Sequence, residues 1–390
     1  MEKLSSRLVS WASLIDEKTV EQARTSSTMP FIYPHLALMP DAHLGLGATV
    51  GSVIPTLGAI MPAAVGVDIG CGMIAVKTQF AASDLPDDRR TVREQIERTI
   101  PLSAGKANCK IVATAEPRIA ELEALAEAKE FDPARYAGNW REQLGSLGSG
   151  NHFIELCIDD NDAVWMFLHS GSRGVGHKIA TRHINVAKDW CRNRHVTLPN
   201  TDLAYLEEAT PEFDTYIAEL RWAQQFALAN REEMIDRFRQ AFAHWMQLEP
   251  HHVEAERINA HHNYCQPESH ADKEVWVTRK GAIDAHRGVM GVVPGSMGTR
   301  SYIVRGKGNP AALCSAPHGA GRRFSRSEAK RRFTAADLAE RMKGIEYRHG
   351  EQWVDEIPDA YKSIDVVIDD SRDLVDVVTT LRQVVNVKGT

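Results

Sequence analysis

The sequence contains no apolar run that approaches the roughly 20 residues needed for a membrane-spanning helix. It shows no repeat period and no Pro- or Ser-rich linker that would divide it into parts. No segment matches the Walker A phosphate loop, so P-loop chemistry is not indicated. These absences exclude an array, a tethered pair of domains and a P-loop NTPase, and we predict one domain spanning residues 1–390.

Cysteine is scarce and scattered. The six cysteines stand at positions 71, 109, 157, 191, 265 and 314, and no two form a CxxC pair. Neither a disulfide framework nor a zinc ribbon is therefore indicated, and the cysteines are expected to be reduced thiols. The segment Met1–Trp11 lacks the long apolar run of a secretory signal, so we expect a cytoplasmic protein.

The composition is that of a globular protein, with 43% hydrophobic residues in 390. The formal net charge is -6, which taken alone argues against a nucleic-acid partner. A local basic surface remains compatible with that sum, so the distribution of charge is more informative than the total.

Two kinds of sequence alternate along the chain. Charge-rich stretches typical of helices cover about 84–130, 179–256 and 327–342, whereas 373–385 fits a short helix or a strand equally well. Glycine-rich segments between them, at 39–72, 144–176 and 275–321, contain the strand-like runs VWMFL (164–168) and SYIVR (301–305). We predict an α+β fold in which helices surround β-sheets and glycine-rich loops line an active-site cleft.

The segment GVDIGCGM places Asp68 and Cys71 three residues apart in a turn flanked by glycines. Glycine permits close backbone approach, which suits a loop that carries metal ligands. A carboxylate and a thiolate at this spacing can point into one cavity. A tight turn with a buried cysteine explains the spacing equally well.

Histidines occur in comparable settings. His152 follows a glycine-rich loop, His169 ends an apolar run, and His262 lies in NAHHNY. Cysteine and histidine alone favour zinc, whereas added carboxylate and water ligands favour manganese, iron or cobalt. If these side chains converge, a thiolate could bridge two cations, and a metal pair suits phosphate chemistry.

Two further segments suit phosphate. PGSMGTRS (294–301) offers hydroxyl and backbone N–H groups, although a serine-rich turn is the commoner explanation. In HGAGRRFSR, His318 precedes a run with six basic residues and one acid, Glu328, up to position 332. Arginine forks bind phosphate oxygens, which favours a role on phosphate or an RNA backbone. His318 itself fits a covalent nucleophile, a metal ligand or a general base.

Together these motifs closely resemble the RtcB family of GTP-dependent RNA ligases. The segments that carry the resemblance are MPDAHLG (39–45), GVDIGCGM (66–73), GSGNHFIE (148–155), LHSGSRG (168–174), HHNY (261–264), RKGA (279–282), PGSMG (294–298), HGAGR (318–322) and VKG (387–389). They cover nearly the whole chain from about residue 30, in the same order.

The resemblance implies a reaction in three steps. The histidine of HGAGR takes GMP from GTP, passes it to an RNA 3′-phosphate, and a 5′-hydroxyl then displaces GMP. A 2′,3′-cyclic phosphate is first opened by water. Two Mn²⁺ ions are the implied cofactor together with GTP. Some family members use a small helper protein, archease, and the sequence does not indicate whether this chain does.

The resemblance also implies roles for individual residues. His318 would be guanylylated; Asp68, Cys71 and His152 would hold one metal; and Cys71, His169 and His262 would hold the other. The implied GMP site comprises Asn151, His152, Phe153, Glu155, His262, Asn263, Pro294, Gly295, Ser296, Met297, Ser301, His318, Gly319, Ala320, Gly321 and Lys388. Asp41 and His43 would support the site, and Arg173 or Arg322 would hold RNA phosphate.

The chain departs from the family pattern at two positions. Leu46 stands where many members have lysine, and Pro317 stands where cysteine or serine is frequent. Proline removes an N–H group and fixes the local backbone. These departures suggest one alternative to the ligase, an RNA-end binding protein without turnover. A second alternative is a metal-dependent RNA-end phosphoesterase, in which the same ligands activate water and His318 is the base.

Overall fold

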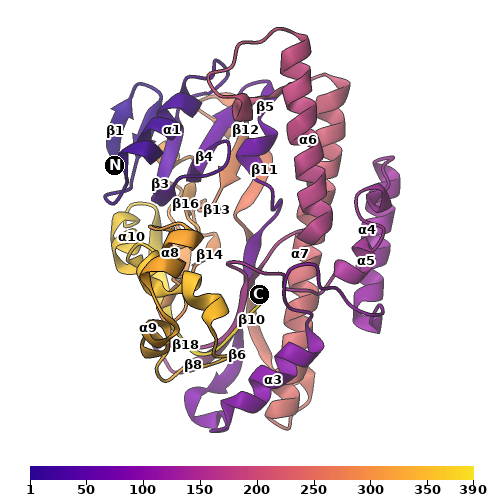
Figure 1. The fold of residues 1–390 in the computed structure, drawn as a ribbon, viewed down its shortest axis with the longest axis vertical. Coiled ribbons are helices and arrows are strands. Elements are labelled where there is room, and N and C mark those ends of the chain that lie inside the picture. The colour runs from indigo at the N-terminus through magenta and orange to yellow at the C-terminus, as the bar shows by residue number, and fades with distance from the viewer.

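Two large β-sheets form the framework of the computed structural model, which describes residues 1–390 (Figure 1). The first has six strands. In spatial order they are β1 Glu2–Ser5, β2 Leu8–Ser10, β3 Leu36–His43, β4 Val50–Thr56, β12 Lys273–Lys280 and β11 Asn263–His270. All its pairs are antiparallel except β2–β3.

The second sheet has eight strands. Along its main path lie β10 Glu254–His261, β6 Gly72–Ala81, β8 Ala163–Ser170, β7 Phe153–Asp159, β18 Val375–Lys388, β15 Ser301–Gly306 and β14 Met290–Val293. β17 (Glu346–Tyr347) joins β18 in parallel. Two short ladders complete the strands: β5 Ala59–Ile60 with β9 Leu206–Glu207, and β13 Ala282–Asp284 with β16 Ser315–Pro317.

Helices cover these sheets. They are α1 Glu17–Ser27, α2 Pro62–Val65, α3 Arg89–Thr99, α4 Glu116–Ala128, α5 Trp140–Gln143, α6 Arg173–Asn193, α7 Pro211–Trp245, α8 Arg326–Arg332, α9 Ala335–Arg341 and α10 Ile364–Asp370. Figure 1 shows α6 and α7 side by side, with α4 and α5 on the outside of α7 and with α8, α9 and α10 on the opposite side of the molecule. No helix combines the length and apolar character needed to cross a membrane.

The 35-residue helix α7 connects two hydrophobic cores. It begins at Pro211, a residue suited to the first helical position, and the Thr210 side chain accepts a hydrogen bond from the Phe213 N–H. Its first half packs with α4, α5 and α6, whereas its second half packs against α3, β6 and β8. Because one helix belongs to both cores, it fixes the α6 layer relative to the eight-stranded sheet.

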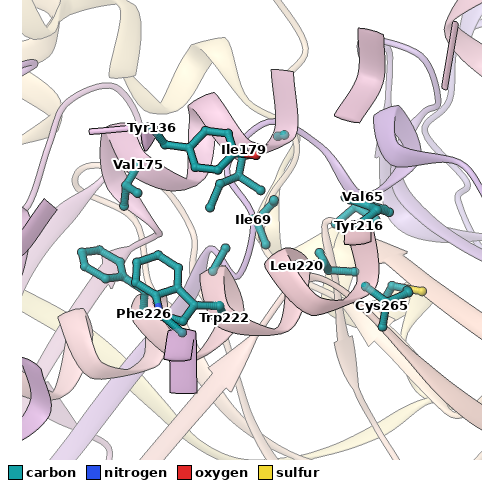
Figure 2. Packing of buried hydrophobic residues seen from close by; sticks show 14 of the residues in the cluster. Val65, Ile69, Tyr136, Val175, Ile179, Tyr216, Leu220, Trp222, Phe226 and Cys265 are labelled. Carbon is teal, nitrogen blue, oxygen red and sulfur yellow. The ribbon is translucent and has the colours of Figure 1, made fainter. Parts of the chain in front are cut away.

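Aromatic residues fill the core between α6 and α7 (Figure 2). Trp222 is fully buried and contacts the rings of Phe131, Trp140 and Phe226 at centroid distances of 5.3, 5.4 and 5.4 Å. Its indole N–H donates to the Leu122 carbonyl at 2.9 Å, so the buried polar group is satisfied.

The predicted α+β class is confirmed, and so are the strands at 164–168 and 301–305. The predicted stretch 84–130 contains α3 and α4 with a loop between them, and 327–342 contains α8 and α9. The prediction of helix over 179–256 was wrong in part. A loop, a 3-10 turn and β9 separate α6 from α7, and residues 254–256 begin β10. The undecided segment 373–385 lies mostly in β18, whose β-branched residues pair with β7 and β15.

We predict that Trp222→Ala lowers the free energy of unfolding by about 3–5 kcal/mol, since it leaves a large cavity in a closely packed core. Urea denaturation measures the difference. Trp276→Ala, at a half-buried ring at the edge of the same core, is the matched control and should cost clearly less. Equal losses in the two variants would contradict the packing described for Trp222.

Candidate active site and metal centre

The ends of neighbouring antiparallel strands bring the sequence-predicted ligands to one edge of the eight-stranded sheet. Cys71 immediately precedes β6, His152 precedes β7, and His169 lies near the end of β8. The register pairs Met73 with His169 and Phe153 with His169. Antiparallel neighbours meet start to end at the same edge, so residues far apart in sequence become adjacent.

His262 links this edge to the first sheet. It lies between β10 and β11, and its N–H donates to the Cys71 carbonyl at 2.8 Å. The His262 carbonyl in turn accepts from the Gly281 N–H at 2.8 Å, at the end of β12. The ligand cluster therefore lies where the edges of both sheets meet.

The five side chains predicted to hold metal converge in two groups that share Cys71. Asp68, Cys71 and His152 form one group, and Cys71, His169 and His262 form the other, with ligand atoms within 4.8 Å of one another. The Cys71 Sγ lies 3.4 Å from His152 Nε2 and 3.1 Å from His169 Nε2. The His169 and His262 Nε2 atoms are 3.3 Å apart.

The hydrogen bonds behind the histidines fit a cation. His152 Nδ1 lies 2.9 Å from the Leu147 carbonyl, and His169 Nδ1 lies 3.2 Å from the Asn151 carbonyl. A carbonyl only accepts, so each Nδ1 carries the proton and each Nε2 presents a lone pair to the cluster. Several acceptors that face one another form a candidate site for a cation, and this donor set fits manganese as well as zinc.

Burial shifts the pKa values of the side chains in the two ligand groups. Burial lowers the pKa of His169 and of His262 well below the usual value, so both rings are neutral and able to bind metal. Burial and the neighbouring Asp68 raise the pKa of the Cys71 thiol.

A buried arginine holds the backbone next to Cys71 and His169. Arg231 on α7 is fully buried and donates to the carbonyls of Gly70 and Ser170 at 2.8 and 3.2 Å. These carbonyls directly precede Cys71 and follow His169. Gly70 has φ +69° and lies against α7, where a Cβ would come within 2.8 Å of the Ala227 Cβ, so glycine is required there.

His318 is held by a buried carboxylate. Its Nδ1 lies 2.6 Å from Asp41 Oδ2, and its backbone N–H donates to the same oxygen at 3.1 Å. Asp41 lies on β3 and is fully buried, whereas the His318 side chain is 14% exposed. Nδ1–H is therefore committed to Asp41, and Nε2 is the nitrogen left for chemistry. Pro317, the last residue of β16, leaves this contact intact.

A cavity of about 350 Å³ joins His318 to the ligand cluster. The predicted residues that line it are Asp68, Cys71, Asn151, Phe153, Glu155, His169, His262, Asn263, Pro294, Gly295, Ser296, Met297, Ser301, His318, Gly319, Ala320, Gly321 and Lys388. His152 lies behind this lining, in contact with Cys71 and Asp68. His43 also lines the cavity, whereas Arg173 does not.

One wall of the cavity has a buried carboxyl and amide. The register of β7 and β18 places Glu155 opposite Asn386, whose Nδ2 donates to Glu155 at 2.8 Å. Burial raises the pKa of Glu155 to about 8. Lys388, two residues further along β18, pairs with Glu356 at 2.9 Å and is itself buried. The C-terminal lysine is thus an ordered part of the site.

The arginines assigned to phosphate have different surroundings. Arg322 donates to the carbonyls of Phe324 and Asp355, to Tyr361 and to Glu356, so its fork is occupied within the protein. Arg173 donates through Nε to Ser146 and lies close to Gly148. Arg173 therefore makes fewer hydrogen bonds within the protein than Arg322 does.

Several lining residues were not predicted from the sequence. Among them are Met73, Ile184, Glu356, Tyr361, Gln383 and Asn386. Asn386 is two residues from Lys388, so the alternation of a strand could have identified it once 375–388 was assigned as β. A bulge between Gln383 and Val385 breaks that alternation, so Gln383 had no such signal.

Comparison with known proteins identifies the family. The model of the RtcB family, described as tRNA-splicing ligase RtcB, matches residues 22–389. The chain belongs to the RtcB family. RNA-splicing ligase RtcB1 and RNA-splicing ligase RtcB, from two Escherichia coli strains (the latter K12), are each 46% identical to it over 381 residues. That match covers 95% of this chain and 93% of each relative.

More distant relatives carry related names. The tRNA-splicing ligase RtcB of Methanococcus maripaludis is 29% identical, with 91% of this chain and 88% of the relative covered. RNA-splicing ligase RtcB2 of Escherichia coli is 30% identical over 378 residues, with 91% and 87% covered. This RtcB chain is accordingly a ligase, and its resemblance to the family is confirmed.

We predict that the chain binds two Mn²⁺ ions, one at each ligand group. Asp68→Asn should lower the affinity for one ion, His262→Ala the affinity for the other, and Cys71→Ala the affinity for both, by about tenfold or more. Loss of a residue that only hydrogen-bonds to a metal ligand already costs affinity of that order. Equilibrium dialysis measures the stoichiometry. Affinity should rise with pH, because the cation must displace the proton of a thiol whose pKa burial raises.

Cys157→Ala is the matched control for this experiment. Cys157 is fully buried in the same sheet but belongs to neither ligand group. If Cys71→Ala retained both ions, or Cys157→Ala lost one, the assignment of Cys71 as the shared ligand would be wrong.

Proposed function

We propose that this chain joins RNA ends that carry a 3′-phosphate or a 2′,3′-cyclic phosphate to 5′-hydroxyl ends, with GTP as the energy source and His318 as the carrier of GMP. The observation that carries the proposal is the Asp41–His318 pair beside the cysteine–histidine cluster. A histidine whose Nδ1–H is held by a carboxylate has a fixed tautomer and a free Nε2 lone pair.

In the proposed first step, Nε2 of His318 attacks the α-phosphorus of GTP. An N–P bond forms, the bond to the β-phosphate oxygen breaks, and pyrophosphate leaves with the electron pair. The ring becomes cationic during the attack, and the buried Asp41 carboxylate stabilises that charge through Nδ1–H. The product is a phosphoramidate, which is labile enough to pass GMP onward.

In the second step, an oxygen of the RNA 3′-phosphate attacks the same phosphorus, the N–P bond breaks, and His318 regains its lone pair. In the third, the RNA 5′-hydroxyl attacks the activated 3′-phosphate. A phosphodiester forms, GMP leaves, and the hydroxyl proton goes to a base. A 2′,3′-cyclic phosphate requires prior opening by water.

We propose Mn²⁺ as the occupant of the two ligand groups. When bound, a metal pair neutralises phosphate charge and polarises phosphate oxygens. The support is the convergence of Asp68, Cys71 and three histidine nitrogens, with Nδ1–H groups committed behind His152 and His169. The group Cys71, His169 and His262 lies beside the nucleophile, since the His262 and His318 rings are 4.7 Å apart.

We propose that the wall around Glu155 receives guanine. Guanine presents two N–H donors on one edge, and a carboxylate that accepts both discriminates against adenine. Phe153, Pro294 and Met297 add apolar surface to the same cavity, and Ser301 adds a hydroxyl. The remaining residues proposed for GMP are the lining residues Asn151, Asn263, Gly295, Ser296, Gly319, Ala320, Gly321 and Lys388, together with His152 behind them.

Incubation with Mn²⁺ and GTP labelled at the α-phosphate should give covalently labelled protein. His318→Ala should carry no label, because the only proposed acceptor nitrogen is gone. Denaturing gel electrophoresis measures the label. His286→Ala is the matched control: His286 Nδ1 lies 2.6 Å from Asp284, the same contact as in the His318–Asp41 pair, but outside the cavity.

Label retained in His318→Ala would contradict the nucleophile assignment. Loss of a terminal or cyclic phosphate from RNA without any GTP requirement would instead favour a phosphoesterase. RNA binding without label or joining would favour an end-binding protein.

Guanylylation should also depend on pH through Glu155. Its pKa is about 8, so the carboxyl is largely protonated at pH 7 and becomes the acceptor that guanine needs as pH rises. The KM for GTP should therefore fall between pH 7 and pH 9. Glu155→Gln should raise KM and remove this pH dependence, as measured by initial rates of guanylylation. A KM that falls equally in Glu155→Gln would exclude Glu155 as the titrating group.

A further inference from the structure

Three aliphatic side chains from different elements form part of the rim of the cavity. Leu46, in the loop between β3 and β4, is 64% exposed, and Val67, just after α2, is 37% exposed. Ile184 on α6 is half-buried. All three line the cavity that contains His318 and Cys71. We call Leu46, Val67 and Ile184 the apolar lip.

The backbone of the lip is fixed although the Leu46 side chain is in solvent. The buried ammonium of Lys280 donates to the carbonyls of Leu46 and Ala63. The Ala48 N–H also donates to the Leu46 carbonyl at 3.0 Å. The Gln22 side chain bonds both the carbonyl and the N–H of Gly45 at 2.6 and 3.1 Å. A fixed backbone that presents an exposed leucine forms a preorganised contact surface.

The lip contributes no charge, while other parts of the cavity lining contribute a great deal. Arg322, Arg326 and Lys388 line the same cavity, and all three pair with the buried Glu356. The apolar lip comes from the first half of the chain and the charged residues from the last quarter. Figure 1 shows α6, which bears Ile184, and α8, which bears Arg326, on different sides of the centre.

A nucleotide likewise has a charged part and an apolar part. Its phosphate needs charge and hydrogen-bond donors, and the faces of its base are apolar and flat. Lys280 is not available as a phosphate ligand at the lip, because its ammonium is buried and already bonded to two carbonyls. Among the cations that line the cavity, Arg326 is the most accessible, with 46% of its side chain exposed. An entering RNA end therefore places a phosphate toward Arg326 and away from the lip, which leaves a base as the group that covers Leu46.

We propose that the apolar lip packs against the nucleobase of the RNA end that enters the cavity, and that Leu46 is a specificity-determining contact for that base. The inference rests on the proposed function, since it assigns the substrate of the same site to RNA. The strength of such packing depends on contact area, so an RNA that ends in a purine should bind more tightly than one that ends in a pyrimidine.

The test measures binding of a short 3′-phosphorylated RNA by fluorescence anisotropy, with Mn²⁺ and without GTP. Leu46→Ala should raise the Kd about three- to tenfold, the range expected for loss of a leucine contact. The loss should be larger for a 3′-terminal or 5′-terminal purine than for a pyrimidine at the same end. The dependence of Kd on salt should not change, because no phosphate contact is removed.

Leu44→Ala is the matched control. Leu44 lies in the same loop and is 49% exposed, but it does not line the cavity. Leu46→Lys is the complementary variant: it should steepen the salt dependence by roughly one counterion and reduce the purine preference, because a phosphate contact replaces a base contact.

Unchanged RNA affinity in Leu46→Ala, an equal loss in Leu44→Ala, or no RNA binding by the unsubstituted chain would each overturn the proposal. The assay contains no GTP, so it is independent of guanylylation. If His318 is not labelled but Leu46→Ala still weakens RNA binding, the assignment of His318 as nucleophile is wrong and the proposal for the apolar lip holds. If His318 is labelled but Leu46→Ala binds RNA normally, the ligase proposal holds and the proposal for the apolar lip is wrong.

Discussion

The hydrogen bond between Asp41 and His318 is the contact on which the rest of the site depends. It joins β3 of the first sheet to the loop after β16 over 2.6 Å, and it commits one ring nitrogen to a buried carboxylate. The backbone around the pair leaves little space. A Cβ at Gly281 would lie 2.9 Å from His318 Cε1, and one at Gly321 would lie 2.3 Å from the Asp41 carbonyl. The glycines of RKGA and HGAGR thus allow three chain segments to meet at one imidazole.

The second constraint is the convergence of electron-pair donors beside that imidazole. The strand order β10, β6, β8 and β7 brings Cys71, His152, His169 and His262 to one sheet edge, and Arg231 holds the carbonyls next to two of them. Lone pairs that face one another in this way form a suitable site for a cation. Binding of a metal ion would therefore stabilise the folded state at this cluster. The proposed nucleophile and the candidate cation ligands lie at the same sheet junction, which suits chemistry that depends on positioning.

The sequence predicts the α+β class and the residues that converge at the cavity, but it does not predict the strand pairing. Asp68, Cys71 and the three histidines were identifiable because each lies in a short glycine-rich motif, and the resemblance to a family supplied their grouping. The spacing of Asp68 and Cys71 alone allowed a tight turn, and His318 alone allowed three roles. Only the geometry shows which nitrogen of His318 is free.

The remaining features depend on long-range pairing that no local pattern encodes. Segment 373–385 was ambiguous because its β propensity becomes decisive only when β7 and β15 flank it. Glu356 lies in a 3-10 turn without a motif, and it enters the site only because Lys388, Arg322 and Arg326 reach it. Leu46 was noted as a departure from the family, but its position at the rim of the cavity is a property of the folded loop.

The central claim is that GMP is carried by His318 and by no other nucleophile in the cavity. Lys280 is the chemical rival, because burial lowers its pKa to about 7 and it lines the same cavity. Mass spectrometry of peptides from guanylylated protein, digested at neutral pH to preserve the N–P bond, separates the two residues. The account predicts a GMP adduct on the peptide that contains His318 and none on the peptide that contains Lys280. An adduct on Lys280, with His318 unmodified, would contradict it.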